Sequence, residues 1–444
     1  MVSGDLNQLN LAGLSSRERA ASHDAQTIDL GEVSAAVFMG RCSEHFDFFV
    51  YAIASVLVFP TLFFPFLPAL DATLASFAMF SLAFIARPLG TSLLMYVQKR
   101  SNRTTKLIVA LFLLGFSTAG MAFVPSYAFL GPMAIVLLAM LRIGQGLAVG
   151  GSWDGFPSLL ALNAPAKKRG WYAMLGQLGS PLGFAIATGA FWYFHSQLSN
   201  QDFLEWGWRY PFFVAFVLNM MALFLRIRLV TSAKYTRLLD DNALIPPPQF
   251  SQLLISQKRN ILLGALAALA SYALFHVVTV FPLSWIVLNT DRSINDFLLI
   301  QMVGAGFAAL GMIASGVIAD QFGRRHTLAG VAVLIGIFSV TTPLLIGGGQ
   351  LGQNLYIFVG FILVGLSYGQ ASGATASNFP SIYRYMGAAL SADLSWLLGA
   401  AFAPLIVLWL TSHYGLAYVG LYLLSGAVTT LLALILNHKL EKHE

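Results

Sequence analysis

Long apolar stretches separated by short polar segments dominate this sequence. Twelve of them have helical length, at about residues 34–63, 71–97, 107–125, 129–155, 170–196, 210–230, 260–288, 297–319, 327–346, 354–379, 386–411 and 415–437. A helix needs about 20 apolar residues to cross the hydrocarbon core of a membrane, which is about 30 Å thick. We therefore predict an all-α, multi-pass membrane protein with twelve transmembrane helices.

The longest internal polar stretch divides these helices into six and six. It contains Pro246, Pro247 and Pro248, which cannot continue a helix. The predicted organisation is a tail at 1–32, a six-helix bundle at 33–230, a linker at 231–259, a second six-helix bundle at 260–437 and a tail at 438–444.

A weak internal repeat supports two pseudo-symmetric bundles. Leu89-Gly90 and Leu310-Gly311 lie 221 residues apart, and so do Arg103 and Arg324. Such a duplication is typical of carriers whose substrate site lies near the middle of the membrane, between the halves.

Composition narrows the class of protein. Hydrophobic residues make up 57% and charged residues 10% of the chain, against about 45–50% and about 25% in an ordinary soluble domain. These values exclude a soluble enzyme, a disordered protein and a coiled coil. The single cysteine, Cys42, allows no intrachain disulfide. Residues 1–30 are polar and contain no apolar signal-peptide segment, so we expect a cytosolic tail.

The distribution of basic residues predicts the orientation in the membrane. The net charge of +6 would suggest a nucleic-acid partner in a soluble protein, but most Lys and Arg residues lie between the apolar stretches. If the first stretch enters from the cytoplasm, twenty of them lie inside and only Arg209 and Arg292 outside. This bias places both termini in the cytoplasm, and no nucleic acid is expected to bind.

Several short strings occur in a characteristic order along the chain. They are Gly40 with Glu44, Phe46, Asp47, Phe48 and Tyr51; Arg87-Pro88-Leu89-Gly90; Arg142-Ile143-Gly144-Gln145-Gly146; Trp208-Arg209-Tyr210-Pro211-Phe212; Asp320-Gln321-Phe322-Gly323-Arg324-Arg325; and Phe379-Pro380 with Arg384-Tyr385-Met386-Gly387. Over residues 36–437 the chain resembles the major facilitator superfamily, and within it the metabolite:proton symporters, bacterial carriers of organic acids and of osmolytes such as proline and betaine.

The resemblance implies a secondary transporter of the bacterial inner membrane that works by alternating access. Its implied partners are a small-molecule substrate, protons and the lipid bilayer, and we expect a monomer without a metal or cofactor. The superfamily's loop motif implies gating roles for Asp320, Gly323, Arg324 and Arg325.

The first half departs from the family pattern at three expected acids. The loop after the second helix reads Lys99-Arg100-Ser101-Asn102-Arg103 in place of D-R-x-G-R. Ser152 stands where the fourth helix usually has a glutamate, and Leu162 stands where a further acid is expected. Either the gate is rebuilt, for example by Asp154 with Lys99 or Arg103, or coupling is altered.

The first helix concentrates ionisable residues, which inside a membrane are functional candidates by default. Arg41, Glu44 and Asp47 step by three and so share a helix face, with Tyr51 one turn further. Burial and neighbouring charge can poise such an acid to take up and release a proton. We expect Asp47, together with Glu44, to carry the proton. The alternative is an Arg41–Glu44 pair that only fixes packing.

The fourth and second helices add basic candidates. Arg142 and Gln145 lie one turn apart, and the Arg142 guanidinium suits a carboxylate. It either holds an organic anion or pairs with an acid of the first helix; the resemblance favours a role for Arg142 in coupling. Arg87 precedes Pro88, which kinks helices, so Arg87 faces either the cavity or the cytoplasmic loop.

The second half offers His276 and Asp393 within apolar stretches. His276 is either a hydrogen-bonded core residue or a proton relay. Asp393 either binds a cationic or zwitterionic substrate or is a second protonation site. The candidate substrate ligands are therefore Arg41, Tyr51, Arg87, Gln145, Tyr272, His276, Tyr368 and Asp393.

Together these features predict proton-coupled uptake of a small organic acid or zwitterionic metabolite. A proton-antiport exporter and a transporter-derived sensor are the alternatives. The sequence contains no H-E-x-x-H, G-x-S-x-G or phosphate-binding glycine loop, which argues against an enzyme and against ATP as the energy source. The charge of the substrate stays open, because membrane-embedded arginines and acids nearly balance.

Overall fold

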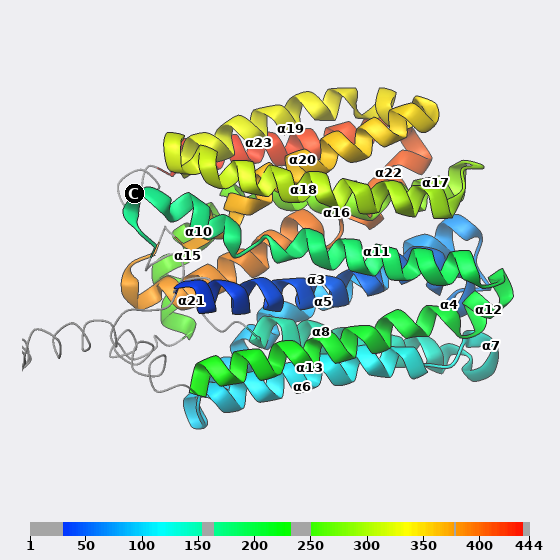
Figure 1. The fold of residues 1–444 in the computed structure, drawn as a ribbon, viewed down its shortest axis with the longest axis horizontal. Helices are drawn as coiled ribbons and strands as arrows, with labels where there is room; N and C mark the ends of the chain where they lie inside the picture. Colours follow the sequence, from blue (N-terminus) through cyan, green and yellow to red (C-terminus); the bar gives the residue numbers. More distant parts are fainter. Residues whose placement is uncertain (1–29, 153–163, 232–249, 377–378, 438–444) are drawn as a thin grey trace, which may run out of the picture.

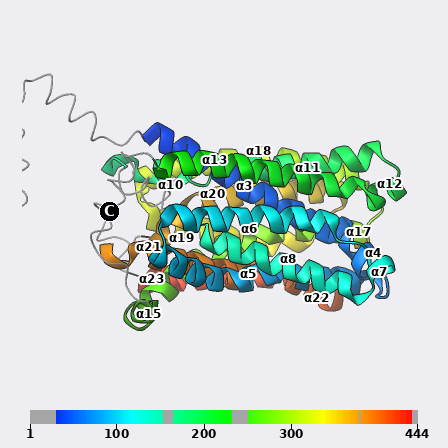
Figure 2. The same ribbon diagram turned by 90° about the horizontal axis from the view of Figure 1, so that it is seen from below.

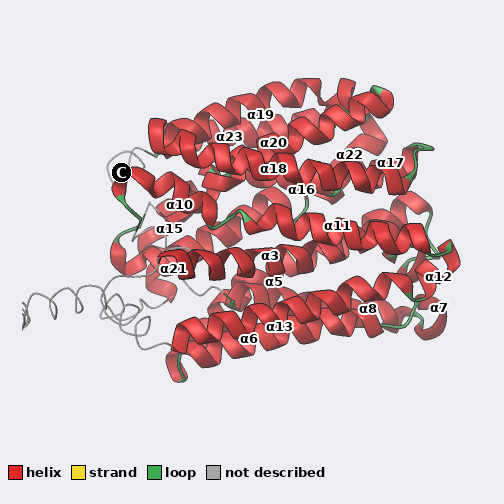
Figure 3. Cartoon of the chain, viewed as in Figure 1, coloured by secondary structure: helices red, strands yellow, loops and turns green. Residues whose placement is uncertain are grey.

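A computed structural model describes residues 30–152, 164–231, 250–376 and 379–437. Long helices run side by side along one direction, and no strand occurs within these ranges (Figures 1 and 3). The first described helix begins and the last one ends at the same end of the bundle, which we call the terminal end. The opposite end is the distal end.

The first half comprises residues 30–231. Its membrane-length segments are α3 (Leu30–Leu57) continued by α4 (Phe59–Phe63), α5 (Ala69–Arg100), α6 (Arg103–Phe123), α8 (Pro132–Gly151), α10 (Arg169–Leu175) with α11 (Gly179–Gln197), and α13 (Tyr210–Thr231). Short helices α7 (Tyr127–Leu130) and α12 (Asn200–Glu205) connect them at the distal end (Figure 2).

The second half comprises residues 250–437. It contains α15 (Phe250–Ala267), α16 (Leu269–Thr279) with α17 (Phe281–Asn289), α18 (Ile294–Phe322), α19 (Arg324–Gly347), α20 (Gly349–Ala376), α21 (Ser381–Ser395) with α22 (Ala403–Tyr414), and α23 (Ala417–Leu436). The π-helical turn Trp396–Ala400 joins α21 to α22.

Length and hydropathy identify ten helices in the described ranges that can cross a membrane. The segments α3 and α10–α11 add two more, and α3 combines membrane length with the charges of Arg41, Glu44 and Asp47. The prediction of an all-helical protein with twelve spans is confirmed. The predicted linker at 231–259 differs in one respect. Helix α15 already begins within it, at Phe250.

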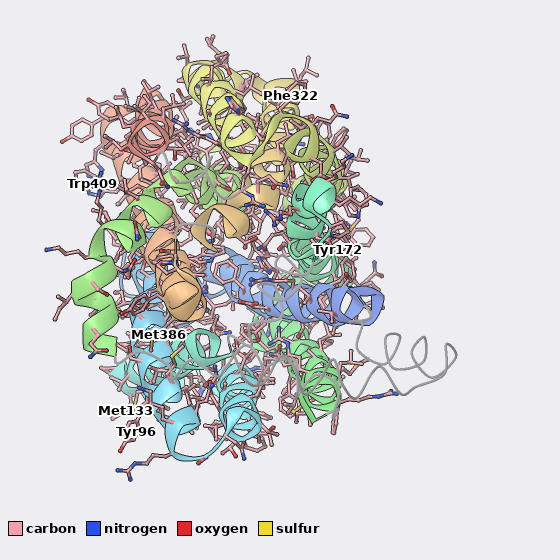
Figure 4. All side chains as sticks on the ribbon, turned by 90° about the vertical axis from the view of Figure 1, so that its left-hand side faces the viewer. Tyr96, Met133, Tyr172, Phe322, Met386 and Trp409 are labelled. Carbon is pink, nitrogen blue, oxygen red and sulfur yellow. The ribbon has the colours of Figure 1, made fainter. Side chains whose placement is uncertain are left out.

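Helix α15 packs across the terminal end rather than adding a span of its own. Its buried residues Leu253 and Ile261 contact Met386 and Leu390 of α21. Figure 4 views the molecule from the terminal end and shows α15 beside Met386. The outer side of this helix is exposed and carries both an apolar residue, Ile255, and a basic one, Lys258.

Glycines bring α5 and α8 into backbone contact. A Cβ atom at Gly146 would lie 2.2 Å from the Ala83 carbonyl oxygen, and one at Gly150 would lie 2.1 Å from that of Arg87. Only glycine allows so close an approach, which membrane helices use because lipid provides no hydrophobic drive for packing. The contact fixes the register of the two helices, so that Arg142 lies beside Phe80 and Gly150 lies beside Arg87.

Candidate functional site

Two adjoining cavities lie between the halves, near the middle of α3, α5 and α8. Their volumes are about 30 and 40 Å³, and both are lined by Glu44, Arg87, Val149 and Trp396. A water molecule needs about 10–15 Å³ measured in this way, so each cavity holds only a few waters. In this state the halves leave little free space at the site.

Asp47 of α3 lies at the centre of a polar network beside the first cavity. Its Oδ1 accepts hydrogen bonds from the Thr118 hydroxyl at 2.5 Å and the Asn219 amide at 3.1 Å, and its Oδ2 accepts one from the Gln145 amide at 2.5 Å. The Ser43 hydroxyl donates to Asn219 Oδ1 at 2.7 Å. Asp47 is only 2% exposed. Three other helices of the first half, α6, α8 and α13, thus each direct a donor at this carboxylate.

Arg142 reaches this network through Gln145. Its Nη1 donates to Gln145 Oε1, while its Nε and Nη2 donate to the Phe80 carbonyl oxygen at 3.3 and 3.1 Å. The guanidinium carbon lies 3.9 Å from the centre of the Tyr51 ring. Gln145 therefore links the guanidinium to Asp47. Its amide oxygen accepts a hydrogen bond from Arg142, and its amide nitrogen donates one to Asp47. Tyr51 serves as a platform under Arg142.

Arg41 and Glu44 form an ion pair within α3. The Arg41 Nη1 to Glu44 Oε2 distance is 2.9 Å, and both side chains are largely buried. Glu44 lines both cavities, and Arg41 lines the second. The spacing of three residues brings these charges together without help from other helices.

Arg87 and Asp393 form a second ion pair, which joins the two halves. Arg87 Nε of α5 lies 3.1 Å from Asp393 Oδ1 of α21. The Thr91 hydroxyl, also of α5, donates to Asp393 Oδ2 at 2.6 Å. The Arg87 guanidinium stacks on Trp396, 5.5 Å from the ring centre. Arg87 thus faces the cavity, as one of the two predicted orientations requires.

Aromatic residues of the second half form the opposite wall. Tyr272 and Tyr368 line the second cavity together with Trp396. His45 of α3 reaches this wall: its Nε2 lies 3.3 Å from the Tyr368 hydroxyl, and its Nδ1 lies 2.9 Å from the Arg41 carbonyl oxygen. Because a carbonyl can only accept, Nδ1 carries a proton.

His276 is fully buried behind Phe48, Phe84 and Trp396, which line the first cavity, and does not itself line either cavity. Its Nδ1 donates to the Ala400 carbonyl oxygen at 2.7 Å, and its ring stacks on Phe48 with 5.1 Å between ring centres. This placement resembles that of a hydrogen-bonded core residue, which was one of its two predicted roles.

At the terminal end, Asp320 connects the two halves. Its Oδ1 accepts from the Gly170 backbone N–H at 2.6 Å and its Oδ2 from that of Trp171 at 3.2 Å, which ties α18 to α10. The sequence predicts charge-assisted bonds of Asp320 and Arg324 across the cytoplasmic ends of the second half. The first turn of α10 presents its free backbone donors to the Asp320 carboxylate.

The other predicted gating residues surround this contact. Gly323 turns the chain with φ of 81°, and buried Arg324 lies against Gly373 of α20. Arg325 Nε donates to the Leu434 carbonyl oxygen at 3.1 Å. Lys99 is exposed at the end of α5. Asp154 and the side chain of Arg103 lie outside the described residues.

The halves also touch at the distal end. His195 Nδ1 of α11 lies 2.7 Å from Asn295 Oδ1 of α18. Together with the Asp320 contact, this bond shows that the two halves meet on both sides of the cavities.

Sequence reasoning did not identify several residues of the site. Thr118, Asn219, Thr91, His45 and Trp396 all contact the predicted residues. Each is uncharged or weakly basic and lies in an apolar helix, where the sequence gives no sign of which face it occupies. The one available signal was that a buried polar side chain requires a partner.

Comparison with known proteins agrees with this architecture. Residues 33–242 match the family model described as sugar (and other) transporter. The chain is 37% identical to the inner membrane metabolite transport protein YhjE of Escherichia coli over 417 residues, covering 92% of this chain and 94% of that protein. It is 28% identical to the E. coli shikimate transporter, covering 93% and 96%, and 27% identical to the proline/betaine transporter of Salmonella typhimurium, covering 92% and 84%.

A solved structure shares the fold. The crystal structure of a D-xylose–proton symporter superposes with a TM-score of 0.66 at 17% identity, covering 93% of this chain and 97% of that one. At this level of identity the likeness concerns the arrangement of helices alone.

Proposed function

Because this chain belongs to the metabolite:proton symporter family of the major facilitator superfamily, we propose that it takes up a small organic acid or zwitterionic metabolite together with protons. It is a multi-pass membrane transporter. We place it in the bacterial inner membrane with its terminal end toward the cytoplasm, as the basic Lys99, Arg100, Lys167 and Lys168 at that end favour.

The observation that carries this proposal is the Asp47 network beside the cavity. The three side chains that donate hydrogen bonds to this buried carboxylate are uncharged, so Asp47 can be ionised or protonated without rebuilding its surroundings. Gln145 connects it to Arg142, and both Gln145 and Arg142 line the first cavity. Proton binding at Asp47 and substrate binding in the cavity can therefore influence each other over a few ångströms.

The substrate is proposed to bind between the charged wall of the first half and the aromatic wall of the second. Arg87 offers a guanidinium for a carboxylate, and Tyr368 and Tyr272 offer hydroxyl groups. Transport then requires the halves to separate at one end at a time, breaking the contact of Asp320 or that of His195.

Proton movement on substrate addition tests the proposal. Proteoliposomes with the full chain receive pulses of shikimate, succinate, proline and glycine betaine while external pH is recorded. We expect alkalinisation outside with one compound, its loss in Asp47→Asn, and its retention in Asp71→Asn, which changes an exposed acid at the distal start of α5.

Other outcomes identify the alternatives. Acidification outside with a transported compound would indicate antiport. Substrate-specific thermal stabilisation without any transport, across the whole panel, would indicate a sensor and would contradict the proposed function.

A further inference from the structure

We propose that Asp393 is an internal substitute for the carboxylate of the substrate: in the closed carrier it occupies Arg87, and a substrate carboxylate takes its place. The proposal rests on the proposed function only in taking the cavities as the substrate site. It assigns the substrate at least one carboxylate group and gives Asp393 the role of a competitor instead of a ligand.

The first observation is the way Arg87 is used. Only its Nε bonds to Asp393, and within the described part of the chain its two Nη groups make no hydrogen bond. Arg87 lines both cavities, so these donors face the space that a ligand would enter. A guanidinium binds a carboxylate best through two parallel N–H groups. The single bond to Asp393 leaves that stronger arrangement unused.

The second observation is the position of Thr91. Its hydroxyl oxygen lies 2.6 Å from Asp393 Oδ2 and 3.1 Å from the Gly150 carbonyl oxygen. A hydroxyl has one proton, so it can donate fully to only one of these acceptors at a time. If Asp393 leaves, Thr91 donates to Gly150, a partner within its own half. Departure of Asp393 therefore leaves the Thr91 hydroxyl with an acceptor, and Arg87 is the one group on α5 that needs a new partner.

The third observation is that the pair spans the two halves. Arg87 and Thr91 lie on α5, whereas Asp393 lies on α21, and both bonds must break when these helices separate. Breaking a buried ion pair without replacement leaves an uncompensated charge, which is strongly unfavourable. A substrate carboxylate on Arg87 compensates the arginine. Substrate binding thus removes two bonds between the halves and favours opening.

Carboxylate binding in the purified full chain tests the proposal without transport or a proton gradient. The probe is sodium acetate, with sodium chloride at equal ionic strength as the reference, and the readout is the acetate concentration at half-maximal thermal stabilisation. In Asp393→Asn we expect that concentration to fall at least about tenfold, which corresponds to about 1.4 kcal/mol. Asp291→Asn, at an exposed acid of the distal end, serves as the matched control.

Two further variants keep the test decisive. Arg87→Gln, alone or combined with Asp393→Asn, is expected to abolish the acetate effect. Thr91→Val keeps the ion pair but removes one anchor of Asp393, so it is expected to strengthen acetate binding by a smaller factor, and it serves if Asp393→Asn fails to fold.

Unchanged or weaker acetate binding in both Asp393→Asn and Thr91→Val would overturn the proposal. The outcome is separate from that of the proposed function. Tighter acetate binding in Asp393→Asn together with no proton movement on any substrate pulse would support the substitute role of Asp393 and contradict proton-coupled uptake.

Discussion

Two buried carboxylates of this carrier, Asp47 and Asp393, are held in opposite ways. Asp47 is held by Thr118, Gln145 and Asn219, all within the first half, whereas Asp393 is held by Arg87 and Thr91 from the other half. When the halves move as rigid bodies, the first network travels intact and the second must break. A proton site benefits from surroundings that persist through the cycle. A residue that controls the change of conformation, as Asp393 is proposed to do, needs contacts that exist in only one part of the transport cycle.

The largest expected effect is that of Asp47→Asn. Asparagine keeps the size of the side chain but cannot exchange a proton, so substrate accumulation driven by a pH gradient is expected to fall to the equilibrium level. Exchange of labelled for unlabelled substrate needs no net proton movement and is expected to persist. Accumulation against a gradient in this variant, measured in proteoliposomes, would remove Asp47 from the proton path.

Arg142→Gln tests whether coupling passes through Gln145. The substitution removes the positive charge and the hydrogen bond to Gln145 Oε1. The Gln145 side chain then keeps its hydrogen bond to Asp47 but loses the partner that fixes its other end. Losing a hydrogen bond that involves a charged group costs about 1.5–3 kcal/mol, so we expect initial uptake rates to fall by about tenfold or more. The pH dependence of transport should change as well; an unchanged pH profile would indicate that Arg142 contacts only the substrate.

A smaller, graded effect is expected along the chain of bonds from Asp47 to Ser43. Asn219→Ala removes a direct donor to the carboxylate and should lower proton-driven uptake by about tenfold, within the range for bonds to charged groups. Ser43→Ala removes only the support of Asn219 and should lower it by about twofold, as for a neutral hydrogen bond. Equal effects of the two variants, measured as initial rates at matched expression, would show that Asn219 acts by packing alone.

The contact at the terminal end should give the smallest effect on uptake and a clear effect on conformation. Asp320→Ala removes the acceptor for the Gly170 and Trp171 backbone N–H groups and should shift the carrier toward opening at that end. Distances between spin labels on α10 and α18 report this shift. His195→Ala, at the distal contact with Asn295, is the opposing control and should shift the population the other way.

The sequence revealed local relations better than distant ones. The Arg41–Glu44 pair and the Arg142–Gln145 contact join residues one turn apart, and their spacing alone predicted that they share a face. The contact that Asp320 makes across the halves could not be predicted from its spacing to other residues of α18 and α19. Its observed partners, Gly170 and Trp171, lie in a helix of the first half.

By itself, the sequence determined the all-helical fold, the twelve spans and the identity of the charged residues inside the membrane, because apolar length and helical periodicity are local properties of the chain. Only the tertiary structure decided which charges meet. Arg87 and Asp393 are separated by 306 positions, and Asp47 and Asn219 by 172. Their contacts depend on how each helix is rotated about its axis, and the backbone contact of α5 with α8 at Gly146 and Gly150 helps to fix that rotation. Helix rotation is a property of packing between elements, so the partners of Asp47 and Asp393 emerge only when the bundle is assembled.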